Sequence, residues 1–224
     1  MILASHLTNP GEAHLRVARR VWLYILSTKG LALQAEACDE GAQEYIADIG
    51  DKDPVFFGAS DAAFADDPDT RRSSQGYVFR LYGMTIDWKS TIQRSVTKST
   101  TEAELLALSL AGSQMEEWAR FFRGVSYRTD TTPTLWCDNQ QTVRIATQQD
   151  DKLITKLKHV DIHQSWIRQE AQAGRLSIKW VDTTSMPADG MTKILGRQKH
   201  TEFLRQLCLV DISARLDQME KGTG

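Results

Sequence analysis

The feature of this sequence that most constrains the fold is a helical pattern over residues 100–123. Residues three or four positions apart on a helix share one face. Here that face begins with an acid and continues with apolar residues: Glu104, Leu108, Ala111, Met115, Trp118 and Phe122. A carboxylate beside an apolar stripe costs free energy unless it is paired or bound to a cation. The pattern therefore predicts a core helix whose first turn carries a functional acid.

A helix cap is the competing explanation for this acid. A Ser or Thr followed three residues later by Glu forms a capping box, and Thr101 with Glu104 has that spacing. Ser99 with Glu102 has it too, and this second pair would leave Glu104 free. The sequence leaves both explanations open. It also predicts a more polar helix face around Glu102, which is shared by Leu106, Ser109 and Ser113.

Strand-like and helical segments alternate around this helix. Apolar runs and alternations predict strands over 55–61, 76–82, 85–88 and 134–138, and around Leu176, Ile178 and Trp180. Helical periodicity covers 11–28, 140–148, 157–172 and 197–208, whereas 35–54 is acidic and lacks a clear period. This order predicts an α/β fold with a mixed five-stranded sheet flanked by helices, preceded by an N-terminal amphipathic helix.

Three further acids lie at the ends of predicted elements. Asp61 ends a strand, Asp138 ends another just before a helix, and Asp189 follows Pro187 at an apparent helix start. Taken singly, these are explained by solvated loops, N-caps and the helix dipole. Together with Glu104, they predict one site of four carboxylates. Carboxylate oxygens are ligands of Mg²⁺, and two such ions can stabilise the attacking and leaving oxygens of a phosphodiester displacement.

The bulk composition sets only broad limits. The 224 residues suffice for one core with an appendage or for two small domains. A net charge of −2 neither indicates a basic nucleic-acid surface nor excludes one beside an acidic site. The sparse cysteines, Cys38, Cys137 and Cys208, favour free thiols and a reducing, intracellular compartment. No apolar run approaches the length of a membrane span, so we expect no membrane partner.

Short motifs in a fixed order connect these acids to a known family. They are Ser60-Asp61-Ala62, Asp67-Pro68-Asp69-Thr70-Arg71-Arg72-Ser73, Gly76-Tyr77-Val78-Phe79, Ser99-Thr100-Thr101-Glu102-Ala103-Glu104, Cys137-Asp138-Asn139-Gln140, Lys158-His159-Val160-Asp161-Ile162, and Ala188-Asp189 with Thr192-Lys193. As an ordered set, the motifs resemble the C-terminal part of a Ty1/copia-type retrotransposon polyprotein. That part comprises the end of the reverse transcriptase and its ribonuclease H domain.

The resemblance implies a ribonuclease H-like fold over residues 51–195. Residues 1–50 would be the end of the reverse transcriptase with a connector, and 196–224 a C-terminal helix and tail. The implied catalytic and metal-binding residues are Asp61, Glu104, Asp138 and Asp189. They would bind two Mg²⁺ ions, with Mn²⁺ as a substitute, and cleave the RNA strand of an RNA–DNA hybrid. The missing polymerase portion would be a partner. Candidate nucleic-acid contacts are Arg71, Arg72, Ser73, Asn139 and Lys158.

The chain departs from the family pattern in three places. Ala63-Phe64 stands where Asp-Trp is usual, and Gly190 replaces an apolar residue, which weakens a helix start by about 1 kcal/mol. There is no Tyr-x-Asp-Asp polymerase motif, so we do not expect this chain to polymerise DNA alone. Two alternatives stay open, and these departures motivate the first of them. One is an inactive relic that binds nucleic acid or serves as a docking domain. The other is a different ribonuclease H-fold enzyme, such as an integrase or exonuclease.

Overall fold

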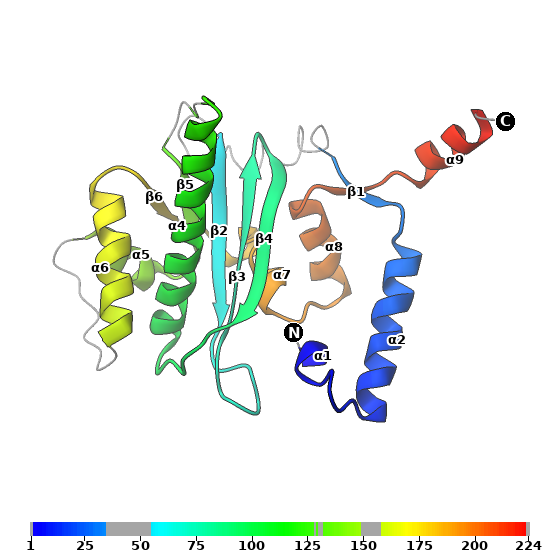
Figure 1. Ribbon diagram of the computed structural model, residues 1–224, viewed down its shortest axis with the longest axis horizontal. Coiled ribbons are helices and arrows are strands. Elements are labelled where there is room, and N and C mark those ends of the chain that lie inside the picture. The colour runs from blue at the N-terminus through cyan, green and yellow to red at the C-terminus, as the bar shows by residue number, and fades with distance from the viewer. Residues whose placement is uncertain (1, 35–54, 128, 130–131, 149–157, 223–224) are drawn as a thin grey trace.

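A five-stranded sheet forms the centre of the computed structural model, which describes residues 2–34, 55–127, 129, 132–148 and 158–222 (Figure 1). The sheet order is β4-β3-β2-β5-β6. The strands are β2 (Phe56–Ala63), β3 (Ser74–Leu81), β4 (Met84–Ile92), β5 (Thr134–Cys137) and β6 (Ser177–Trp180). Strands β2, β3 and β4 pair antiparallel, and β5 and β6 continue the sheet parallel to β2. The predicted α/β class with a mixed sheet is confirmed, although β4 extends beyond the predicted 85–88.

One face of the sheet is covered by α4 (Thr100–Gly124), α5 (Gln140–Thr147) and α6 (Lys158–Gln172) (Figure 1). The predicted apolar stripe of α4 is buried there, including Leu108, Ala111 and Met115. The polar second face is less exposed to solvent than expected, because Glu102 and Ser109 are buried, whereas Ser113 is exposed. Helix α6 packs beside α4 and covers that side, where Ser109 Oγ lies 2.8 Å from His163 Nδ1.

The opposite face carries a smaller core. Side chains alternate along a strand, so Phe56 points to the helical side while Phe57, Ala59 and Trp136 point away from it. The segment after β6 covers them with Val181, Met186 and Ala188. This segment contains the 3₁₀ helix η2 (Thr183–Ser185) and leads into α7 (Asp189–Thr192) and α8 (Arg197–Gln206), which lie on the same side (Figure 1).

An outer unit combines both ends of the described chain. It contains α1 (Ile2–Ser5), α2 (Glu12–Ser27), β1 (Leu31–Leu33), β7 (Leu209–Asp211) and α9 (Ser213–Gly222). Strand β1 pairs antiparallel with β7, which joins two segments that the sequence analysis treated separately. The amphipathic helix predicted over 11–28 is confirmed as α2, and none of its residues is buried.

The cysteines are not all free thiols. Cys137 is a buried free thiol, whereas Cys208 is disulfide-bonded. The expectation of free thiols is therefore confirmed for Cys137 and wrong for Cys208, and Cys38 lies outside the described residues. Among the described helices, none combines the length and apolarity needed to cross a membrane.

Candidate metal centre

The four predicted acids converge at one end of the sheet. Asp61 lies near the end of β2, and Asp138 follows β5 directly. These two strands are parallel neighbours, so their carboxyl ends lie side by side. Glu104 comes from the first turns of α4, and Asp189 begins α7. Asp61 and Asp189 thereby lie in a common site, although they are 128 positions apart in the sequence.

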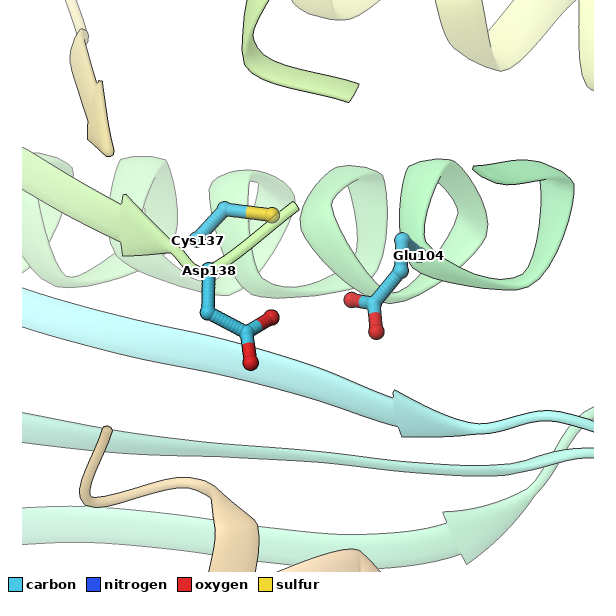
Figure 2. Close-up of side chains that lie close together, drawn as sticks. All are labelled: Glu104, Cys137 and Asp138. Carbon is cyan, nitrogen blue, oxygen red and sulfur yellow. The ribbon is translucent and has the colours of Figure 1, made fainter. Parts of the chain in front are cut away.

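The side chains form two groups that share one acid. Asp61, Asp138 and Asp189 each offer an oxygen atom, and these atoms lie within 4.8 Å of one another. Glu104, Cys137 and Asp138 form a second group within the same limit. Figure 2 shows the carboxylates of Glu104 and Asp138 turned toward one another. A carboxylate common to two groups suits two cations bound close together.

Neighbouring residues provide the helix caps and leave the acids free. Ser99 Oγ accepts a 3.1 Å hydrogen bond from the Glu102 amide at the start of α4. Asn139 Oδ1 accepts a 3.0 Å bond from the Thr142 amide at the start of α5. The sequence had left open whether Glu104 belongs to a helix cap or to a functional site. Because Ser99 caps α4, capping does not explain Glu104. Asp138 does not cap α5 either and instead accepts a 2.9 Å bond from Thr183 Oγ1.

Glu104 has one carboxylate oxygen without a partner. Its Oε1 accepts a 3.3 Å hydrogen bond from the Ala62 amide, whereas its buried Oε2 has no hydrogen-bond partner among the residues that the structure describes. Burial, followed by the charges of Asp61 and Asp138, raises the pKa of Glu104 to about 9. An unpaired buried oxygen is energetically costly. A cation bound here would satisfy Oε2 and favour the ionised carboxylate.

Lys193 adds a positive charge that the sequence analysis did not assign to the site. Its Nζ lies 3.1 Å from Asp61 Oδ1 and 2.6 Å from Asp189 Oδ1. Thr192 Oγ1 also donates a hydrogen bond to Asp61 Oδ2. Burial lowers the pKa of Lys193. The negative charges of Asp61 and Asp189 have a larger, opposite effect and raise that pKa above its usual value. The sequence signal that could have indicated this role is the four-residue spacing between Asp189 and Lys193, which places the cation one helical turn from the acid.

The donor set fits a hard divalent cation. Burial is the main cause that raises the pKa of Asp138 and of Asp189, and the charge of Asp61 adds to it. Burial and then Glu104 also raise the pKa of the Cys137 thiol, so it stays protonated and is a poor ligand. Carboxylate oxygens therefore dominate the site. Such oxygens suit Mg²⁺ and Mn²⁺.

The candidate nucleic-acid contacts differ in accessibility. Arg71 and Arg72 are exposed in the loop after β2. Ser73 is fully buried, and its hydroxyl accepts a 3.0 Å bond from the Ala65 amide and lies 3.1 Å from Thr97 Oγ1. Ser73 thus holds the loop and presents no group to solvent. Asn139 serves as the α5 cap, as shown above. The side chain of Lys158 lies outside the described residues.

The strand order and directions, with four acids at one sheet end, define a ribonuclease H-like domain. No family model matches the chain. Among solved structures, LC11-RNase H1 isolated from compost is 17% identical with a TM-score of 0.47, covering 62% of this chain and 93% of that one.

Sequence relatives identify the family. The chain is 30% identical over 198 residues to the retrovirus-related Pol polyprotein from transposon TNT 1-94 of Nicotiana tabacum, covering 88% of this chain. It is 26% identical over 213 residues to that from transposon RE1 of Arabidopsis thaliana, covering 92%. Over most of its length, the chain is therefore similar to a segment of copia-type retrotransposon Pol polyproteins, as its ordered motifs predict. It spans only 14% and 13% of the length of these two relatives.

A shorter relative carries a different name. The chain is 34% identical over 110 residues to the secreted RxLR effector protein 161 of Plasmopara viticola. This match covers 49% of this chain and 68% of that protein.

Proposed function

We propose that this chain acts as a retrotransposon ribonuclease H, hydrolysing the RNA strand of RNA–DNA hybrids with two divalent ions during reverse transcription. The observation that carries the proposal is the convergence of four carboxylates into two groups sharing Asp138, with the buried Glu104 Oε2 unpaired. The similarity to Pol polyproteins supports the same conclusion. We further propose that the chain works with the polymerase portion of such a polyprotein, inside a cytoplasmic particle or the nucleus.

Some residues of the site would bind the metal ions, and others orient the carboxylates that bind them. Asp61, Glu104, Asp138 and Asp189 would bind Mg²⁺, or Mn²⁺ in its place. When bound, the ions activate water and stabilise the leaving 3′ oxygen. Thr183 orients Asp138, and the Ala62 amide orients Glu104. Lys193 balances part of the negative charge of Asp61 and Asp189.

Substrate contact is proposed at the same end of the sheet. The loop with Arg71 and Arg72 joins β2 to β3, and Asp61 lies near the end of β2. The two exposed guanidinium groups can bind phosphates, which position a nucleic acid without reading its sequence. Contacts to the 2′-hydroxyl would then distinguish the RNA strand from the DNA strand.

The test is cleavage of a labelled RNA–DNA hybrid in Mg²⁺ by the parent chain and by Asp138→Asn. We expect the parent to leave 5′-phosphate and 3′-hydroxyl ends. The variant should be at least about a hundredfold slower, because each metal contact contributes several kcal/mol. Asp182→Asn is the matched control, since Asp182 is an exposed cap of η2 outside the acid groups. Hybrid cleavage by Asp138→Asn at the parental rate would contradict the proposal.

Other substrates separate the alternative functions. Faster cleavage of single-stranded or duplex DNA than of hybrid would indicate a different enzyme of this fold. A folded parent that cuts no substrate would favour an inactive relic or a domain that depends on its polymerase. Adding a polymerase fragment in trans distinguishes these two, because only the dependent domain would gain activity.

A further inference from the structure

Asp189 is held differently from the other three acids. Asp61 and Asp138 belong to paired strands or their ends, and Glu104 lies on the 25-residue helix α4. Asp189 begins α7, a helix of four residues. So short a helix has little stability of its own. The position of the Asp189 carboxylate therefore depends on the tertiary contacts of α7.

The sheet supports α7 from one side. A Cβ atom at Gly76 of β3 would lie 2.5 Å from Met191 Cβ and 2.9 Å from the Lys89 carbonyl oxygen. Met191 therefore sits directly against the β3 backbone, and only glycine leaves it room. Ser90 Oγ of β4 also donates a hydrogen bond to the Met191 carbonyl oxygen. Helix α7 is thus fixed on strands β3 and β4.

Phe203 of α8 contacts α7 from another direction. A Cβ atom at Gly190 would lie 2.4 Å from both Cδ2 and Cε2 of the Phe203 ring. The ring therefore packs against the Gly190 backbone, one residue from Asp189. Figure 1 shows α8 next to α7 on the side away from α4. The family pattern has an apolar residue at position 190. This packing explains why the chain has glycine there, because a side chain would collide with the Phe203 ring.

Helix α8 is itself anchored to the central sheet and the segment before α7. Thr85 Oγ1 of β4 donates a 3.0 Å hydrogen bond to the carbonyl oxygen of Leu207, directly after α8. Gln206 Nε2 donates a 3.4 Å bond to the Thr184 carbonyl oxygen in η2. Both Gln206 and Leu207 are buried. Phe203 therefore extends from a fixed support.

We propose that Phe203 is a positioning residue for Asp189. Its ring presses on Gly190 and holds α7 against the sheet, so that the Asp189 carboxylate meets those of Asp61 and Asp138. Phe203 is not among the residues that offer a ligand atom to the two metal-binding groups. The inference rests on the proposed function, because it takes the four acids as the ion-binding site. It makes α8 part of the metal-binding apparatus, although α8 carries none of the four acids.

The test is calorimetric titration of Mn²⁺ into the full chain without nucleic acid. We expect Phe203→Ala to bind Mn²⁺ roughly tenfold more weakly, as for residues that orient metal ligands. Phe203→Leu retains an apolar side chain against Gly190 and should recover most of the affinity. Phe121→Ala is the matched control, because this exposed ring of α4 contacts Trp118 and Phe122 instead. It should bind Mn²⁺ with parental affinity.

A second pair of variants tests the contact itself. Gly190→Ala places a methyl group into the Phe203 ring and should also weaken Mn²⁺ binding. Combining Gly190→Ala with Phe203→Ala removes the clash, so the double variant should bind more tightly than Gly190→Ala alone. Urea unfolding of each variant checks that the chain is folded. A general loss of stability would not produce this recovery.

The possible outcomes distinguish this inference from the proposed function. Parental Mn²⁺ affinity in folded Phe203→Ala would overturn the inference and leave the proposed function intact. If Phe203→Ala does not fold, parental affinity in Gly190→Ala would overturn it instead. A parent chain that binds no Mn²⁺ would overturn both.

Discussion

The central region, which is the five-stranded sheet with the helices packed on it, and the outer unit both contain amphipathic helices. The two regions differ in how far the apolar side chains of these helices are buried. Helix α4 lies on the sheet and beside α6, and buries residues such as Leu105 and Leu108 completely. Helix α2 buries no residue, and Trp22 and Leu23 remain about three-fifths exposed, at 61% and 62%. The comparison teaches that periodicity predicts a helix, whereas burial depends on what the fold places against it.

The two regions also differ in electrostatics. All four candidate acids belong to the central region, where burial raises the pKa of three of them. The outer unit contacts α8 through an aromatic pair, since Tyr24 of α2 lies edge-on to His200 of α8 with 5.5 Å between the ring centroids. Stability, metal binding and pH dependence should therefore all depend on the central region.

The largest expected difference concerns buried and exposed tryptophan. Trp136 is completely buried in β5, with its ring 4.7 Å from that of Phe57. Trp136→Ala should lower the free energy of unfolding by about 3–5 kcal/mol, because it leaves a cavity. Trp22→Ala in α2 should change it by less than about 0.5 kcal/mol, as for surface positions. Urea unfolding measures both, and comparable losses would break the comparison.

A smaller effect is expected at Lys193. In EDTA, Lys193→Met leaves the fully buried carboxylate of Asp61 without its cation. We expect a loss of about 1–3 kcal/mol in the free energy of unfolding, below the value for a fully buried pair because Lys193 is partly exposed. Mg²⁺ should restore much of this loss. The control Lys199→Met removes an exposed charge of α8 and should have little effect. An unchanged variant in EDTA would show that Lys193 does not balance the acids.

A third expected effect is a dependence of the free energy of unfolding on pH. The pKa of Glu104 is raised from its usual value of 4.5 to about 9 in the folded chain, so the folded state binds more protons than the unfolded state between these two pH values. The free energy of unfolding in EDTA should therefore fall as pH rises through this window, by up to about 1.4 kcal/mol per pH unit.

Two variants locate this slope in the central region. Glu104→Gln should flatten it, because the amide does not titrate. Glu12→Gln in α2 should leave it unchanged, since Glu12 is exposed. Urea unfolding at pH 6, 7 and 8 measures the difference. An equal slope in Glu104→Gln and the parent would assign the pH dependence to other groups.

Local sequence signals predicted most of the central region. The apolar stripe headed by Glu104 predicted α4, and the alternating residues predicted the strands that carry Asp61 and Asp138. The β1–β7 pair was missed, because strands of three residues are too short to show a period. The role of Lys193 was missed because its ion pair with Asp61 spans 132 residues.

The sequence by itself determined which elements form and which acids they carry. Periodicity and the caps at Ser99 and Asn139 depend on residues a few positions apart, so they are encoded locally. Only the tertiary structure decided that Glu104 lies beside Asp138 with a raised pKa, and that Phe203 presses on Gly190. These properties arise from charges and volumes that distant segments bring together, and neither is visible in the neighbouring sequence.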